Sequence, residues 1–355
     1  MHRSAFTVIE LLVVIAIIAL LLAILLPSLK KARIHAKEVV CGSTLNGFGK
    51  MLGLYTYANN DWLPGVNTSG VSVSVKKSAD LPEALYDPFL PVQPFDWLTP
   101  LLIQEITSLP EKRADRFNHL LDYYRCPALT DTASLPYGSP PDDEDFEAIT
   151  HWPATSYLMP AYFQYWGDQQ AGQVLASMER INVLKVRAQS APDIMDKVRV
   201  KDYVSRMNRV GGPENKIFVA DGTRYLTEEY DLDFDIEPFP TFFGSFTSSG
   251  AWWRGSTAYG VSSDSEGWSP DTRSSKASPS EGQNLTLSYR HGLPYSHRGR
   301  AEKNLGMINA LFFDGHVELL SDRDSREIGY WYPRGAVVVD PDEGMTEVPE
   351  GFRVN

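Results

Sequence analysis

The first 27 residues read MHRSAFTVIELLVVIAIIALLLAILLP, and this stretch decides the fold class of the chain. From Phe6 to Leu26 every residue is apolar except Thr7 and Glu10. At about 1.5 Å per helical residue, the run is long enough to cross a lipid bilayer. A carboxylate near the bilayer centre costs about 2.5–3.5 kcal/mol, so we expect Glu10 to meet a partner.

Two ordinary interpretations of this run leave something unexplained. A secretory signal peptide fits poorly, because the run is too long, contains Glu10 and ends without a small-x-small cleavage site. A plain signal anchor fits the length but gives no role to the acid. A third interpretation has to account for both features.

The segment Ala5-Phe6-Thr7-Val8-Ile9-Glu10-Leu11-Leu12 resembles the class III signal of type IV pilins and type II secretion pseudopilins. In that family a prepilin peptidase cuts before an aromatic residue, here between Ala5 and Phe6, and methylates the new amino terminus. The family's acid stands four residues after the aromatic, as Glu10 does, and Pro27 falls where its membrane helix usually carries proline. Ala5 departs from the family, which usually has glycine before the cut.

The resemblance implies a mature chain that begins at Phe6, with Glu10 neutralising the amino terminus of a neighbouring subunit. Opposite charges attract strongly in a low-dielectric helix bundle, so such a pair can set the register of assembly. The implied partners are prepilin peptidase, other pilin-like subunits and inner-membrane lipid. The alternative is an acid that reaches the interface of an ordinary anchor.

Composition and charge limit the function of the rest of the chain. A content of 43% hydrophobic and 12% aromatic residues over 355 positions is ample for a packed core. Residues 1–40 carry a net charge of +3, whereas the remainder carries about −15. An acidic body argues against a nucleic-acid partner, while the basic stretch after the apolar run suits lipid headgroups.

The side of the membrane on which the body lies is a point of conflict. Four cations follow the apolar run and only Arg3 precedes it, so the positive-inside rule places the body in the cytoplasm. Two observations favour the opposite side: the even pair Cys41 and Cys126, and the pilin resemblance. They predict a single-pass inner-membrane protein whose body lies in the periplasm or outside the cell. They also predict a Cys41–Cys126 disulfide. Two buried free thiols are the alternative. The four cations are Lys30, Lys31, Arg33 and Lys37.

The helix continues beyond Pro27. Leu45, Phe48 and Leu52 recur at helical spacing, as do apolar residues before them, until Asn59-Asn60-Asp61 stops the pattern. We therefore expect an α+β fold of pilin-like lollipop form, in which a helix from about 6 to 58 packs on a β-rich head with long loop insertions. The segments are a leader (1–5), a transmembrane and filament-core helix (6–27), its amphipathic continuation (28–60) and an extracytoplasmic head (61–355) with a Ser/Gly-rich insertion (245–284).

Two Asp-Gly pairs predict β-hairpins in the head. Asp221-Gly222 and Asp314-Gly315 each separate two strand-like runs, which is the pattern of a type I′ turn. Short helices are expected at 97–106 and 174–185.

Arg290-His291-Gly292 and, further along the chain, the run 309–317 with its Asp314-Gly315 pair resemble the C-terminal motif of a large pilin-like family abundant in planctomycetes and verrucomicrobia. That motif pairs a histidine with a downstream Asp-Gly. The interval here is longer than usual, which indicates an insertion.

We considered metal and calcium sites. His291, His297, Asp314 and His316 lack metal-motif spacing, which favours a buried histidine bonded to hairpin backbone. Alternation in 231–237 places four carboxylates on one strand face, which predicts a solvated edge, with Ca²⁺ as the weaker alternative. We expect no other cofactor. The four carboxylates are Asp231, Asp233, Asp235 and Glu237.

No nucleophile, zinc-protease, P-loop or dinucleotide motif occurs, so we do not expect an enzyme. The favoured function is a structural pilin-like or pseudopilin subunit of a type II secretion-like pseudopilus or type IV pilus-like fibre, in a minor role. The alternative is a membrane-anchored extracytoplasmic binding protein or enzyme, directed at carbohydrate through aromatic residues of the insertion. These are Trp252, Trp253, Tyr259 and Trp268.

Overall fold

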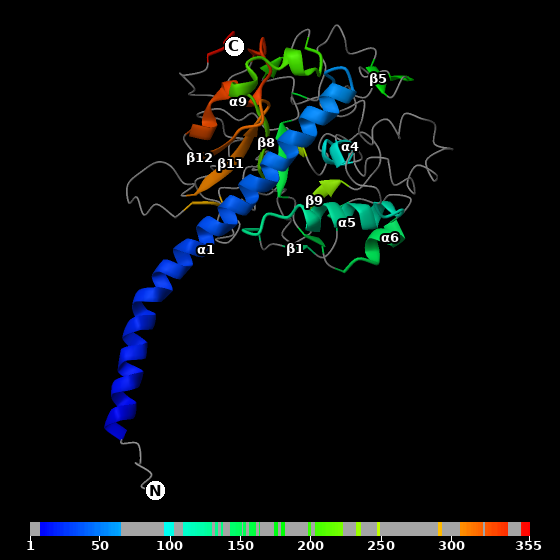
Figure 1. The fold of residues 1–355 in the computed structure, drawn as a ribbon. Helices are drawn as coiled ribbons and strands as arrows, with labels where there is room; N and C mark the ends of the chain where they lie inside the picture. Colours follow the sequence, from blue (N-terminus) through cyan, green and yellow to red (C-terminus); the bar gives the residue numbers. More distant parts are fainter. Residues whose placement is uncertain are drawn as a thin grey trace.

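A long helix projecting from a mixed head is the main feature of the computed structural model (Figure 1). The structure describes most of the long helix and the central part of the head. The described residues are 8–64, 96–102, 109–129, 143–150, 156–160, 203–222, 290–292, 306–321, 324–339 and 349–355, together with Phe163 and short strand segments between these ranges.

Helix α1 spans Val8–Ala58, in agreement with the predicted helix from 6 to 58. It contains Pro27, whose missing N–H removes one backbone hydrogen bond and favours a bend, and Figure 1 shows α1 bending before it reaches the head. It ends where Asn60 and Asp61 adopt positive φ angles of 52° and 65°. The polar stop predicted at residues 59–61 is therefore confirmed.

The head is built on a five-stranded sheet with the order β10-β4-β8-β11-β12. Neighbouring strands are antiparallel, except for the parallel pair of β10 and β4. The long helix and this sheet together confirm the α+β lollipop. The strands are β4 Tyr157–Pro160, β8 Ile217–Asp221, β10 Thr247–Ser248, β11 Met307–Phe312 and β12 Val317–Ser321.

The C-terminal part of α1 lies across β11 and β12. Its buried side chains begin at Cys41, and Leu29 and Val39 remain 49% and 68% exposed, so the continuation predicted from residue 28 is buried against the head only in its later part. At Gly49 an added Cβ would lie 3.2 Å from the Cα of Gly315. A glycine that weakens the helix by propensity therefore permits close contact with the β11–β12 hairpin.

Aromatic rings join α1 to the centre of the sheet. Phe48 of α1 lies 5.2 Å from Trp97, which lies 5.5 Å from Phe218 of β8, and Phe218 lies 5.2 Å from Phe313. Edge-on and tilted pairs at these distances add to the gain from apolar burial. The helix and sheet thus share one core.

Smaller elements complete the described head. Helix α4 lies inside the predicted helix at 97–106, of which residues 103–106 lie outside the described residues. The helix predicted at 174–185 is wrong, because strands β5 and β6 pair there as an antiparallel hairpin. The remaining elements are α5 Arg113–Tyr123, β1 Thr132–Ala133, β2 Pro136–Tyr137, α6 Asp143–Glu147, β3 Trp152–Pro153, β5 Val174–Ala176, β6 Glu179–Ile181, β7 Val198–Arg199, η2 Met207–Arg209, η3 Pro213–Asn215, β9 Leu232–Asp235, η5 Asp324–Arg326, α9 Ile328–Trp331 and β13 Val337–Val338, with α4 at Leu98–Leu102.

Candidate functional site

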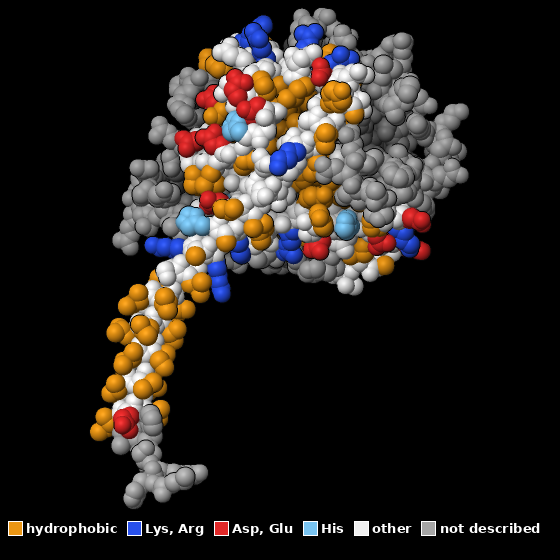
Figure 2. Space-filling view, in the orientation of Figure 1, with side chains coloured by type: hydrophobic (Ala, Val, Ile, Leu, Met, Phe, Trp, Pro, Cys, Tyr) orange, Lys and Arg blue, Asp and Glu red, His pale blue; other side chains and the backbone are white. Residues whose placement is uncertain are grey.

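The N-terminal half of α1 is an apolar helix that nothing in the described chain covers. Its most apolar 18-residue window is 0% buried, and the helix is long and apolar enough to cross a membrane. Leu20 and Ile24, for example, are 64% and 68% exposed. Figure 2 shows apolar side chains along this half, with an acid near its N-terminal end. Because water does not solvate such a surface favourably, lipid or other helices must cover it.

A basic collar separates the apolar half of α1 from the head (Figure 2). Its side chains are exposed, and it directly follows the segment that is long enough to span a bilayer. Clustered cations at this position attract anionic lipid headgroups. The collar consists of Lys30, Lys31, Arg33 and Lys37.

A disulfide fastens α1 to the head. Cys41 in α1 and Cys126, which follows α5, are bonded, with a Cα–Cα distance of 5.4 Å. Both side chains are fully buried. The predicted pairing is therefore present, and the alternative of two free thiols is wrong.

Beside the disulfide lies a buried cluster of charged and polar side chains. The Nε2 atom of His291 lies 3.1 Å from Oδ2 of Asp221 and 3.5 Å from Sγ of Cys126. The same Oδ2 accepts the backbone N–H of Asn309 at 2.6 Å. Arg290 donates to the carbonyls of Ser156 and Gly222, and its Nε lies 4.0 Å from Oδ1 of Asp221. Removing one member would leave a buried charge without compensation.

The residues 290–292 also reach α1 directly. Gly292 donates its backbone N–H to Glu38 of α1 at 3.2 Å. It adopts a φ of +70°, and an added Cβ would lie 3.1 Å from Cγ of Met307, so only glycine fits without strain. His291 forms a backbone bridge with Met307 of β11. His291 is buried, as predicted, but only its main chain bonds the strand backbone, and its side chain pairs with Asp221.

Asp314 and Gly315 form the turn of the β11–β12 hairpin, as predicted. Gly315 has a φ of +93° and donates its N–H to the carbonyl of Phe312, while Asp314 does not adopt a positive φ. This is a type I turn followed by a left-handed glycine, so the expected type I′ geometry is wrong. The Asp314 carboxylate bonds His316, not His291. Each half of the histidine…Asp-Gly motif therefore contacts α1 separately, through Glu38 and through Gly49.

The hairpin predicted at Asp221-Gly222 is not the structure that these residues adopt. Asp221 is the last residue of β8 and is completely buried, pairing with Tyr157 of β4. Gly222 donates its N–H to the carbonyl of Ser156. An Asp-Gly pair predicts a turn only when the aspartate is exposed, and here its carboxylate serves the buried cluster.

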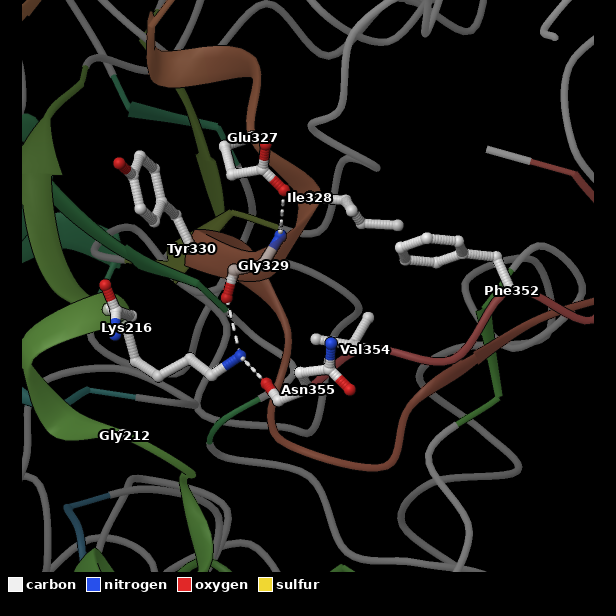
Figure 3. Close-up of a pocket in the computed structure, with 10 residues that line it drawn as sticks. Gly212, Lys216, Glu327, Ile328, Gly329, Tyr330, Phe352, Val354 and Asn355 are labelled. Atoms are coloured by element: carbon white, nitrogen blue, oxygen red, sulfur yellow. Dashed lines mark hydrogen bonds between the residues drawn. The ribbon is translucent and has the colours of Figure 1, made fainter. Parts of the chain in front are cut away.

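A separate cavity of about 390 Å³ lies at the C-terminal side of the head (Figure 3). Lys216 extends along it and donates to the backbone oxygens of Gly329 at 2.6 Å and Asn355 at 2.8 Å. Burial lowers the pKa of Lys216 to about 8, and the charge of Glu327 partly opposes that shift. Because its ammonium donates to both oxygens, Lys216 links the 349–355 segment to α9.

Several predicted sites lie outside the described residues. These are the cleavage site at Ala5 and Phe6, His297, and the aromatic residues of 245–284. Strand β9 is present at Leu232–Asp235, but the carboxylate side chains of 231–237 are among those not described. The calcium alternative therefore stays a prediction.

Comparison with known proteins adds an independent observation. A family model described as the prokaryotic N-terminal methylation motif matches residues 1–26. The N-terminal region of the chain is therefore pilin-like, with a prepilin-type signal. The type IV wide pilus major component PilA4 of Thermus thermophilus is 47% identical over 61 residues.

That similarity covers 17% of this pilin-like chain and 47% of the Thermus protein, so the chain spans about half the length of the curated relative. No solved structure matches the chain. The matched region of 61 residues is far shorter than the chain, so most of the chain is described from its own structure.

Sequence reasoning missed several residues of the cluster. Arg290 and Asn309 lie within the stretches that resemble the family motif, but nothing in the sequence assigned either of them a role in a buried cluster, and Glu38 looks like an ordinary surface acid of a helix. The signal present in the sequence was the Arg290-His291-Gly292 triplet with its resemblance to the family motif. Lys216 gave no signal, since a single lysine before an apolar strand is common.

Proposed function

We propose that this protein is a membrane-anchored, pilin-like subunit, processed by prepilin peptidase and assembled with other pilin-like subunits through the apolar half of α1. The observation that carries the proposal is the exposed apolar helix joined rigidly to a head. A helix in this form can be covered by lipid before assembly and by neighbouring helices after it.

Glu10 is the assembly residue in this proposal. An acid in the first turn of α1 is costly within lipid, and the new amino terminus of a neighbour offers it a positive charge. The basic collar fits the same arrangement, because it would hold the head at the surface of an anionic bilayer. Prepilin peptidase, pilin-like subunits and inner-membrane lipid are therefore the proposed partners, with the head in the periplasm or outside the cell.

We place the protein among minor subunits of a type IV pilus-like fibre or a type II secretion-like pseudopilus. A head of about 290 residues with 24 prolines in the chain and a long insertion packs poorly in a repeated, high-copy fibre. The role is structural and not enzymatic. The carbohydrate-directed alternative rests on aromatic residues outside the described part, and no observation favours it.

The test is a Glu10→Gln substitution, which keeps the size of the side chain and removes its charge. The matched control is Glu147→Gln, an exposed acid on α6 in the head. We expect Glu10→Gln to reach the membrane normally but to be lost from sheared fibres and from cross-linked complexes with other pilin-like subunits. If Glu10→Gln enters those complexes as Glu147→Gln does, Glu10 does not direct assembly.

A further inference from the structure

Three groups that bind transition metals meet at the disulfide, and a carboxylate lies next to one of them. The sulfurs of Cys41 and Cys126 and a ring nitrogen of His291 lie within 4.8 Å of one another, and all three residues are buried. Asp221 adds a carboxylate oxygen 3.1 Å from His291 Nε2. The four residues come from α1, the segment after α5, the segment 290–292 and β8, so folding alone brings them together.

Two of the separations between these groups fit a tetrahedral zinc site. With Zn–S near 2.3 Å and Zn–N and Zn–O near 2.0 Å, tetrahedral geometry places the sulfur and nitrogen ligands about 3.5 Å apart and the nitrogen and oxygen ligands about 3.3 Å apart. The corresponding separations here are 3.5 Å for Cys126 Sγ to His291 Nε2 and 3.1 Å for His291 Nε2 to Asp221 Oδ2. The two sulfurs would have to move apart, to about 3.8 Å, once their bond is absent.

The charges also balance. Zn²⁺, two thiolates and the Asp221 carboxylate sum to −1, and the buried guanidinium of Arg290 beside that carboxylate brings the cluster to zero. A neutral cluster avoids the large penalty of an uncompensated buried charge. The other carboxylate oxygen, Asp221 Oδ1, is buried without a hydrogen-bond partner, so Asp221 has acceptor capacity left for an ion.

We propose that, while its thiols are reduced, the chain binds one Zn²⁺ or similar thiophilic divalent cation through Cys41, Cys126, His291 and Asp221. Binding releases the two thiol protons. A disulfide oxidant then takes two electrons from the thiolates and becomes two thiols, using two protons from solvent, while the Cys41–Cys126 bond forms and the ion leaves. The ion thus holds α1 on the head before the disulfide does.

The proposal is tested on the full chain in detergent micelles. The protein is reduced with a phosphine, freed of metal under argon and given one equivalent of Zn²⁺ or Co²⁺. We expect one ion per chain, a thiolate-to-cobalt charge-transfer band with intense tetrahedral visible absorption, and protection of both thiols from alkylation. Adding oxidised glutathione should release the ion as the disulfide forms. Absence of any ion above that bound by Cys41→Ser/Cys126→Ser overturns the proposal, including when the reduced chain is unfolded.

Variants separate this site from adventitious thiol binding. His291→Gln should weaken Zn²⁺ binding by more than about 100-fold, the upper range for loss of a supporting residue around a zinc site. The control His316→Gln removes an exposed histidine that pairs with Asp314 and should bind as wild type does. Equal affinity in wild type and His291→Gln, or a cobalt spectrum that is not tetrahedral in the wild type, refutes the assignment.

Discussion

Replacing Cys41 and Cys126 by alanine removes the covalent connection between α1 and the head. The two residues are 85 positions apart, and closing a loop of that length in the unfolded chain is worth about 4.6 kcal/mol at 25 °C in the chain-entropy description. Each alanine also leaves a small cavity in a fully buried position. We therefore expect the free energy of unfolding of the head to fall by about 4–5 kcal/mol.

The assay is guanidinium chloride unfolding of the full chain in detergent, followed by the fluorescence of the buried residues Trp97, Trp152 and Trp331. With a denaturant slope of about 4 kcal/mol/M, the midpoint should fall by about 1 M. Each single alanine variant should lose nearly as much as the double variant, because either change breaks the bond. Single losses that are small and add up to the double loss would refute the reasoning.

Three further results are expected, all from the same unfolding assay. Asp221→Asn should cost about 3–5 kcal/mol because it leaves the buried arginine beside it uncompensated, whereas Asp314→Asn in the exposed turn should change stability by less than about 1 kcal/mol. Gly49→Ala should destabilise the protein by about 1–3 kcal/mol, because its Cβ would lie 3.2 Å from hairpin backbone. Gly47→Ala, whose Cβ would meet nothing within 4 Å, should stabilise it by up to about 1 kcal/mol. If Gly47→Ala were the more destabilising of the two variants, the packing of α1 would be contradicted. Burial lowers the pKa of Lys216 from 10.5 to about 8 in the folded chain, so between pH 8 and about 9.5 Lys216 carries more protons in the unfolded chain than in the folded one. The free energy of unfolding should therefore rise with pH in this range. If a Lys216→Met variant shows the same dependence of stability on pH, this reasoning is refuted.

The long helix could be predicted because its cause is local. Apolar residues from Val8 onward, the helical spacing of Leu45, Phe48 and Leu52, and the polar stop at residue 59 all act within a few turns. The disulfide followed from the resemblance and the even cysteine count, and the structure agrees. By contrast, the start of packing at Cys41 depends on where the head lies, which the helical pattern does not contain.

The buried cluster could not be predicted in the same way, because its members are distant in the sequence. Asp221 sits next to glycine, and that local pattern favours a turn, yet the strand pairing of β8 with β4 and β11 buries its carboxylate. His291 was expected to bond hairpin backbone; its main chain bonds Met307, whereas its side chain pairs with Asp221 of β8. The Asp314 turn was predicted correctly, and its type was not, because three residues rather than two form the loop.

The most direct test of the central claim is mass spectrometry of the N-terminal peptide of the protein purified from its native membrane. Processing by prepilin peptidase predicts that residues 1–5 are absent and that the chain begins with N-methyl-Phe6, which adds the mass of one methyl group to the peptide. A mature chain that retains Met1, or one that begins at another residue, would contradict the account.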